Sequence, residues 1–204
     1  MAHDLIGKTL VRMVDFMGKY YKLSGTIVET EAYGSNNDPA SHAFKKKTSR
    51  NWVMYDRPGK IYIYFIYGNH YCFNIVAKNY ENTAGAILIR AIQPLEGINL
   101  MKIFRKTGNI NYLASGPGKL TQAFKISKKH NGIDITDNKN DFFFLEEEIS
   151  QTEIKKFKVL ETKRIGLTHA LDKQWRFIML DPIVTGKDHA ATEFVPNPYL
   201  SKRG

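Results

Sequence analysis

The sequence predicts an α+β fold in which a curved, mostly antiparallel sheet carries flanking helices and a protruding β-hairpin. Three observations favour this class: many short runs rich in β-branched and aromatic residues, only a few segments with helical spacing, and no regular alternation of strands and helices. The 204 residues suit one domain or two small ones and can bury a substantial core. Because no internal repeat and no linker divides the chain, we expect a single compact domain over residues 1–204.

Two segments near the N-terminus begin the predicted fold. Asp4 can cap a short helix that starts at Leu5, and residues 10–13 have the composition of a first strand. Gly18 and residues 19–22 then indicate a turn into the next strand.

That next strand, over residues 25–33, carries the first candidate chemistry. Its alternation places Glu29, Glu31 and Tyr33 on one face, and Ile27 is expected on the same face. Acidic side chains on a strand usually form a solvated outer face. An acidic face is nevertheless unexpected in a strongly basic protein, so two carboxylates and a tyrosine form a candidate site.

A tyrosine-rich hairpin is expected over residues 61–74, where two aromatic runs flank Gly68 and Asn69. A Gly-Asn pair between such runs is typical of a very tight hairpin turn. That turn would hold Tyr67 at or beside an exposed tip, where small polar residues are the norm. Tyr67 is therefore either a stray aromatic on a core strand or a wedge for a base stack.

The polar segment before the hairpin is expected to be a loop, and it carries His42, three lysines and Arg50. A lysine run is usually solvated surface, but this one lies between the two unusual strands, so Arg50 is a candidate phosphate contact. Arg90 follows the hairpin and is either paired to a carboxylate or directed at an anion. The remaining predicted elements are a strand over residues 85–92, a core-facing helix over residues 95–105, and strands over residues 142–145, 156–160 and 175–180.

The charge balance points to a polyanionic partner. Thirty Lys and Arg residues against twenty Asp and Glu residues give a net charge of +10, which favours nucleic acid or an acidic membrane surface. No apolar run reaches the ~18 residues of a spanning helix. No basic amphipathic helix has a strong apolar face, and the N-terminal residues lack the pattern of a signal peptide. We therefore expect a nucleic acid and no membrane.

The chain offers little for thiol or metal chemistry. Cys72 is the single cysteine, so no intrachain disulfide can form, and its apolar surroundings predict a buried, inert thiol in a reducing compartment. The six histidines are scattered, with no pair at i, i+4 spacing and no cysteine cluster. A zinc site is therefore not expected.

Residues 115–124, SGPGKLTQAF, suggest a phosphate loop but do not match one. Position 113 is leucine rather than glycine, and Lys119 is followed by leucine, so a nucleoside triphosphate site is not expected. A Gly-Pro-Gly-Lys turn that opens a helix still presents free backbone N–H groups and a lysine. Lys119 is therefore a candidate contact for a single backbone phosphate.

Several of these motifs together resemble the alkyladenine (3-methyladenine) DNA glycosylase family. They are VETEAY, a histidine nine residues after its tyrosine, the hairpin run YIYFIYG followed by Asn74, RAIQPLEG starting at Arg90, and SGPGKLTQA. The runs RIG and WRF, at Arg164 and Trp175, are also similar to that family. The resemblance spans residues 5–179 with its motifs in order, which makes it specific although no single motif is.

The resemblance implies a role for each polar candidate. Glu31 would be the general base that activates a water against the anomeric carbon, because a carboxylate can accept a proton and stabilise a cationic sugar. Arg90 would position that water or a neighbouring phosphate. Glu29 receives no catalytic role, and a structural or surface carboxylate is the preferred interpretation.

The same resemblance implies how a damaged base is held. A glycosylase flips the nucleotide out of the duplex, and Tyr67 would intercalate in the vacated space. Tyr33 and His42 would form one aromatic wall of the base pocket, and Tyr64 would form the other. Asn74 would disfavour guanine by crowding its exocyclic amine.

The hairpin register decides whether Tyr64 and Asn74 can face the same pocket. A strict two-residue loop would pair Tyr64 with Phe73 and turn Asn74 to the opposite face. We therefore expect an extra loop residue or a bulge near His70. The sequence also departs from the family pattern at Gly34, where a bulkier residue can stand, and this departure could loosen the pocket wall.

We expect a base-excision-repair enzyme acting on double-stranded DNA, with purine lesions such as 3-methyladenine, 7-methylguanine, hypoxanthine and etheno-adenine as substrates. Because no lysine or N-terminal proline is placed as a Schiff-base nucleophile, the enzyme should be monofunctional and leave an abasic site. No metal or organic cofactor is expected. The protein should be a cytoplasmic, nucleoid-associated monomer, and the lack of an N-terminal extension suggests a prokaryotic type.

Two other functions fit part of the sequence. Glu29 and Glu31 lie ~6.6 Å apart along one strand and could be the acid and base of a sugar glycosidase, but the positive charge and Tyr67 then have no use. A non-catalytic nucleic-acid-binding module, with the hairpin as an aromatic stacking platform, explains the charge and the tyrosines. That second alternative leaves Glu31 without a role.

Overall fold

One antiparallel sheet organises the computed structural model, which describes residues 1–66, 70–79, 82–137, 143–146 and 157–180. Its strands are β1 (Thr9–Phe16), β2 (Lys19–Tyr33), β3 (Ile61–Ile66), β4 (His70–Val76), β5 (Ala86–Glu96), β6 (Phe143–Glu146), β7 (Lys158–Thr162) and β8 (Arg176–Leu180). The α-helices in the described residues are α1 (Ile98–Arg105) and α2 (Pro117–Ala123), and 3-10 turns are formed by η1 (Trp52–Tyr55), η2 (Ile110–Tyr112) and η3 (Lys128–His130). The predicted α+β class is confirmed.

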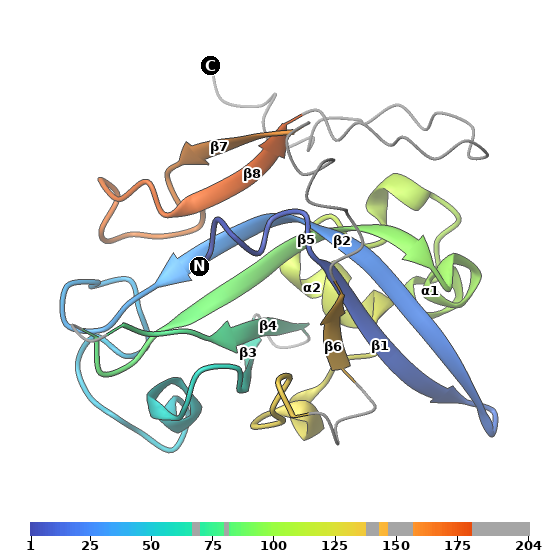
Figure 1. Cartoon of the computed structure of the whole chain (residues 1–204), viewed down its shortest axis with the longest axis horizontal. Coiled ribbons are helices and arrows are strands. Elements are labelled where there is room, and N and C mark those ends of the chain that lie inside the picture. The colour runs from blue at the N-terminus through green and yellow to red at the C-terminus, as the bar shows by residue number, and fades with distance from the viewer. Residues whose placement is uncertain (67–69, 80–81, 138–142, 147–156, 181–204) are drawn as a thin grey trace.

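The long strand β2 lies at the centre of the sheet, whose order is β3-β4-β5-β2-β1-β6 (Figure 1). Its first half pairs with β1 over residues 19–26, and β5 pairs with it from Ser24 to Tyr33. Where β1 ends, β8 takes its place and pairs with β2 over residues 29–31. The segment that carries both glutamates is therefore enclosed by hydrogen-bonded strands on both sides.

The β3–β4 hairpin separates two environments by its alternation. Ile63 and Phe73 point into the main apolar core, to which α2 also contributes. Tyr62 instead belongs to a smaller core with residues of η1 and of the loop after β2. Successive side chains of a strand point to opposite faces of the sheet, so the tyrosines at even positions of β3 face away from the main core.

The hairpin register answers the question raised by the sequence. Tyr62 pairs with Asn74, Tyr64 with Cys72, and Ile66 with His70. Three residues, 67–69, therefore lie between the last paired positions, so the two-residue turn is wrong and the extra loop residue is confirmed. Tyr67 itself falls outside the residues that the structure describes.

Two helix predictions are wrong, the first for the whole element and the second in where the helix begins. Residues 2–7 form turns rather than a helix, because Gly7 adopts a φ of 88° and its N–H donates to the Ile27 carbonyl of β2. The helix expected from residue 95 begins only at Ile98. Glu96 still belongs to β5, where it pairs with Ser24, and the left-handed Gly97 then turns the chain into α1.

The predicted strands agree better with the structure than the helices do. Each expected strand overlaps an observed one, although β1 and β5 extend further than the sequence indicated. The clean alternation expected in β2 is interrupted, because its register with β5 shifts between Ile27 and Thr30. Ile27 packs in the main apolar core, whereas Glu29 lies in a polar network.

Candidate active site

A transverse row of paired residues crosses five strands and brings the candidate polar residues together. The row runs Tyr62, Asn74, Leu88, Glu31, Arg176 through β3, β4, β5, β2 and β8. Directly paired residues of antiparallel strands point to the same face, so Glu31 and Asn74 share a face. They are separated by two strand spacings, roughly 10 Å.

The Glu31 carboxylate is fully buried and satisfied by three donors from three segments. Its Oε2 accepts a hydrogen bond from the Tyr33 hydroxyl at 2.8 Å and another from Arg90 Nη1 at 3.1 Å. Its Oε1 accepts from the backbone N–H of Ile165 at 3.0 Å. With an exposed fraction of 0%, this carboxylate does not lie on the solvated strand face that acidic residues usually form.

Glu29 continues the network on the other side of Arg90. Its Oε1 accepts from Arg90 Nε at 2.9 Å and from Arg176 Nε at 2.6 Å, and the residue is 3% exposed. Buried charged groups are stable in a protein when they are paired and hydrogen-bonded. Here the guanidinium groups of Arg90 and Arg176 neutralise the carboxylates of Glu29 and Glu31. Glu29 thus has the structural position expected of it, and the carboxylate pairing predicted as one option for Arg90 is confirmed.

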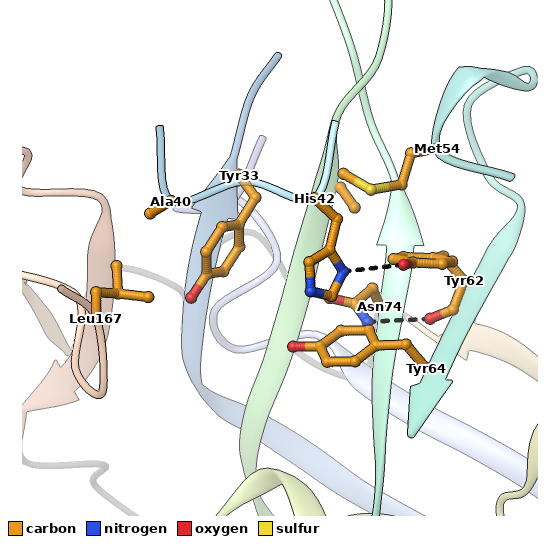
Figure 2. A pocket seen from close by; sticks show the side chains of 9 residues that line it. Tyr33, Ala40, His42, Met54, Tyr62, Tyr64, Asn74 and Leu167 are labelled. Carbon is orange, nitrogen blue, oxygen red and sulfur yellow. Dashed lines mark hydrogen bonds between the residues drawn. The ribbon is translucent and has the colours of Figure 1, made fainter. Parts of the chain in front are cut away.

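Beside this network lies a pocket of about 110 Å³ that faces the even-numbered side chains of the hairpin. It is lined by Tyr33, Ala40, His42, Met54, Tyr62, Tyr64, Asn74, Ala86 and Leu167 (Figure 2). The structure therefore brings the four predicted base-binding residues, from β2, the loop after it and both strands of the hairpin, to one cavity.

The aromatic walls differ from the predicted arrangement. The rings of His42 and Tyr64 contact each other edge to face, with centroids 4.6 Å apart and planes at 77°. Two rings that sandwich a base must be roughly 7 Å apart, twice the ~3.5 Å contact distance, so no base fits between these two. Figure 2 shows Tyr33 standing apart from the cluster of His42, Tyr62 and Tyr64, which makes Tyr33 one wall and that cluster the other.

Hydrogen bonds hold His42 and Asn74 in place beside Tyr62. The His42 Nδ1 lies 3.0 Å from the Tyr62 hydroxyl. The Asn74 amide donates to the Tyr62 carbonyl at 3.0 Å and approaches the Cys72 carbonyl at 3.4 Å. Asn74 is buried, so its orientation in the pocket is fixed by the hairpin backbone.

Burial sets the protonation of the pocket side chains. It lowers the pKa of His42, with a further contribution from the nearby charge of Arg50, so the imidazole is neutral at neutral pH. Burial together with the Glu31 charge raises the pKa of Tyr33, which keeps its hydroxyl protonated as the donor to Glu31. For Cys72, burial raises the pKa to about 11, so the buried thiol is protonated at neutral pH.

The sequence did not reveal a clamp that joins the two sides of the site. Arg164 donates from both terminal nitrogens to the Asp38 carboxylate, at 2.7 and 2.6 Å, and also to the Ala32 carbonyl at 2.9 Å. Its guanidinium lies 4.7 Å from the centroid of the Tyr33 ring. Asp38 opens the loop that carries His42, so this pair ties the loop to the end of β2.

The segment between β7 and β8 contributes more than this clamp. Arg164 is followed by Ile165, whose N–H binds Glu31, and by Leu167, which lines the pocket. The only signal in the sequence was the RIG run at Arg164, because no charge pattern distinguishes Asp38 from the other polar loop residues.

The two candidate phosphate contacts lie outside the pocket. Arg50 is exposed, donates to the Phe65 carbonyl at 3.3 Å, and lies 6.0 Å from the Tyr64 ring. Lys119 follows the predicted glycine-proline turn at the start of α2, where Gly116 has a φ of 142°. Its amine contacts Ser115 Oγ at 3.3 Å and lies over the Tyr112 ring.

Among the described residues, no three His, Cys, Asp or Glu side chains are grouped so that they could hold a metal ion. Over the same residues, no helix is long and apolar enough to cross a membrane.

Residues 1–182 match the family model described as methylpurine-DNA glycosylase (MPG). A protein of Prosthecochloris aestuarii is 45% identical over 202 residues, covering 99% of this chain and 85% of its own. A protein of Chlorobium phaeobacteroides is 43% identical (91% and 90% covered), and one of Francisella tularensis is 42% identical (91% and 92% covered). All three are provisionally named 3-methyladenine DNA glycosylase. By these matches the chain belongs to the methylpurine-DNA glycosylase family. Its buried Glu31 lies beside an aromatic pocket.

Proposed function

We propose that the chain is a monofunctional DNA glycosylase of base excision repair, which hydrolyses the N-glycosidic bond of alkylated or deaminated purines in duplex DNA. The observation that carries this proposal is the Glu31 carboxylate, held by Arg90 and Tyr33 at the edge of an aromatic pocket. Family membership and the names of the bacterial relatives support the same class of substrate.

In the proposed reaction, Glu31 accepts a proton from a water molecule whose oxygen forms a bond to the anomeric carbon. The glycosidic C–N bond breaks, its electron pair leaves with the purine, and the DNA keeps an abasic sugar. The carboxylate also stabilises the positive charge that develops on the sugar. Arg90 donates hydrogen bonds to both Glu31 and Glu29, so it fixes the orientation of the Glu31 carboxylate, the general base. The carboxylates of Glu31 and Glu29 outweigh the effect of burial and raise the pKa of Arg90, which remains a cation.

The damaged purine is proposed to lie between Tyr33 and the wall formed by His42 and Tyr64. Stacking on aromatic rings contributes about 1–3 kcal/mol per base, and electron-rich rings favour purines made cationic by alkylation. Asn74, held by the hairpin backbone, is proposed to crowd the exocyclic amine of guanine. Tyr67 is proposed to intercalate where the nucleotide was extruded.

Substrate entry is proposed to open the site. The cavity of about 110 Å³ is smaller than the roughly 300–1,000 Å³ of common ligand pockets, and Glu31 has no exposed surface. A water can therefore reach this carboxylate only when the Tyr33 hydroxyl or the Ile165 segment moves. Such an opening on binding damaged DNA would also keep Glu31 from undamaged nucleotides.

A glycosylase assay across a panel of damaged purines tests the proposal. The wild-type protein should release free base and leave the strand uncut, whereas Glu31→Gln should bind the same lesion duplexes and release base at least about 100-fold more slowly. Near-full release of the purine by Glu31→Gln would refute the assignment of Glu31 as the general base. Tyr67→Ala should weaken lesion binding, and unchanged affinity and turnover would remove Tyr67 from the mechanism.

The same assay separates the alternatives. A nucleic-acid-binding module would bind lesion DNA and release no base. A sugar glycosidase with Glu29 as its acid is disfavoured by the structure, because two guanidinium groups already occupy that carboxylate.

A further inference from the structure

A second recess lies on the far side of the hairpin from the pocket. It has a volume of about 690 Å³ and is bounded by the end of α1, by α2 and by the chain that follows α2. Four cationic residues line it, namely Arg105, Lys106, Lys125 and Lys129. We call this recess, with those four residues, the basic groove.

Among the described residues, no carboxylate neutralises the charges of the basic groove. None of the four cations forms an ion pair within the part of the chain that the structure describes, and no acidic residue lines the recess. Arg105 donates to the backbone carbonyls of Leu113 and Tyr112 and to the Gln122 amide oxygen. The Lys125 amine lies near a backbone carbonyl and two aromatic rings. Neutral acceptors orient these cations but leave their charge available to an anion.

Hydrogen bonds join the basic groove to the tip end of the hairpin. Gln122 and His70 are joined at 3.2 Å, and the Thr121 hydroxyl donates to the Tyr71 carbonyl at 3.0 Å. His70 and Tyr71 are the first residues of β4, directly after the tip. These bonds link the basic groove directly to the hairpin that carries Tyr64 and Asn74.

The hairpin stands between two recesses of different character. Tyr64 and its partner Cys72 face the pocket side, whereas the next pair, Phe65 and Tyr71, faces the opposite side, where Tyr71 lines the basic groove. A hairpin tip inserted into a duplex has DNA backbone on both of its sides. The pocket accounts for the extruded nucleotide on one side, and the four cations that line the basic groove on the other side suit the neighbouring phosphates.

We propose that the basic groove binds backbone phosphates of duplex DNA on the side of the hairpin away from the base pocket. This inference rests on the proposed function, which it extends by naming the surface that holds the duplex while a nucleotide is extruded. Phosphate contacts position a protein on DNA without reading sequence. The basic groove should therefore contribute equally to undamaged and damaged duplexes.

The test measures binding to an undamaged duplex as a function of salt concentration. Each phosphate contact contributes about 0.9 to the slope of log K against log salt, so replacing Lys106, Lys125 and Lys129 together with Gln should reduce the slope by about 2 to 3. Lys158→Gln, a control on exposed β7, should leave the slope within about 0.3 of the wild-type value. Replacing the same three lysines with Arg should restore the slope, which excludes a folding defect.

Three outcomes would overturn the inference. The triple Gln variant could keep the wild-type slope, Lys158→Gln could lower the slope as much per charge, or the triple variant could lose affinity for heparin while its affinity for duplex DNA stays unchanged. The readout is binding rather than base release. A protein that released no base would refute the proposed function yet could still show the predicted slopes.

Discussion

The Asp38–Arg164 clamp offers the sharpest test of how the site is held together. Both side chains have an exposed fraction of 0%, and two hydrogen bonds of 2.7 and 2.6 Å join them. Removing one partner of a buried ion pair leaves an uncompensated charge and costs about 3–5 kcal/mol. Asp38→Asn should therefore lower the free energy of unfolding by about that amount, out of the roughly 5–15 kcal/mol of a typical domain.

A double-mutant cycle with Arg164→Met separates the pair from its surroundings. Once both charges are gone, no buried charge is left unpaired, so the double variant should lose less than the sum of the single losses, by at least about 2 kcal/mol. Urea unfolding measures these differences, and binding of lesion duplexes reports whether Tyr33 and His42 stay in place. Each single variant should bind lesion DNA at least about tenfold more weakly, because the clamp joins their two segments.

The half-exposed pair of Lys22 and Glu96 provides a matched control. Glu96→Gln should cost under about 1 kcal/mol, as surface ion pairs usually do. A stabilising role for the clamp is ruled out if Asp38→Asn costs no more than Glu96→Gln, or if the losses from Asp38→Asn and Arg164→Met are simply additive.

Three further predictions concern the protein around the site. Burial and the Arg12 charge lower the pKa of His130 to about 4. Below about pH 6.5 the His130 imidazole is protonated in the unfolded chain but stays neutral in the folded chain down to about pH 4. The free energy of unfolding should therefore fall by up to about 3 kcal/mol between pH 6.5 and 4. In His130→Gln, the free energy from urea unfolding should depend less on pH over that window. Tyr62→Phe removes the hydrogen bond to His42 and should cost about 1 kcal/mol in urea unfolding, with lesion binding measurably weaker; unchanged values would show that this bond does not order the wall. Glu29→Gln leaves two buried guanidinium groups with one carboxylate, so its thermal midpoint should drop by several degrees, and an unchanged midpoint would contradict the network.

Predictions that depended on local sequence patterns were more accurate than those that depended on contacts between distant parts of the chain. Alternation of aromatic and β-branched residues identified the hairpin, and the need for Tyr64 and Asn74 to share a face gave its register. The end of β5 was misplaced because its last residue, Glu96, is held by a partner in β2, and pairing across the chain extended the strand beyond its local pattern.

The candidate site shows the same limit. Glu31, Tyr33, His42, Tyr64 and Asn74 could be named from motifs, and the structure brings them together. That His42 and Tyr64 contact each other, and that Tyr33 stands opposite, depends on loop conformation, which no spacing in the sequence specifies. The Asp38–Arg164 clamp joins residues 126 positions apart, so only the folded chain reveals it.

The pairing of β8 with β2 has a consequence for synthesis of the protein on the ribosome. Arg176 meets Glu29 across 147 positions, and Ile165 meets Glu31 across 134. A nascent chain that has emerged only as far as β6 can pair β2 with β1 and β5, but its glutamates still lack a guanidinium and a backbone donor. The polar network around the two glutamates of β2 is therefore completed only after β8 has emerged.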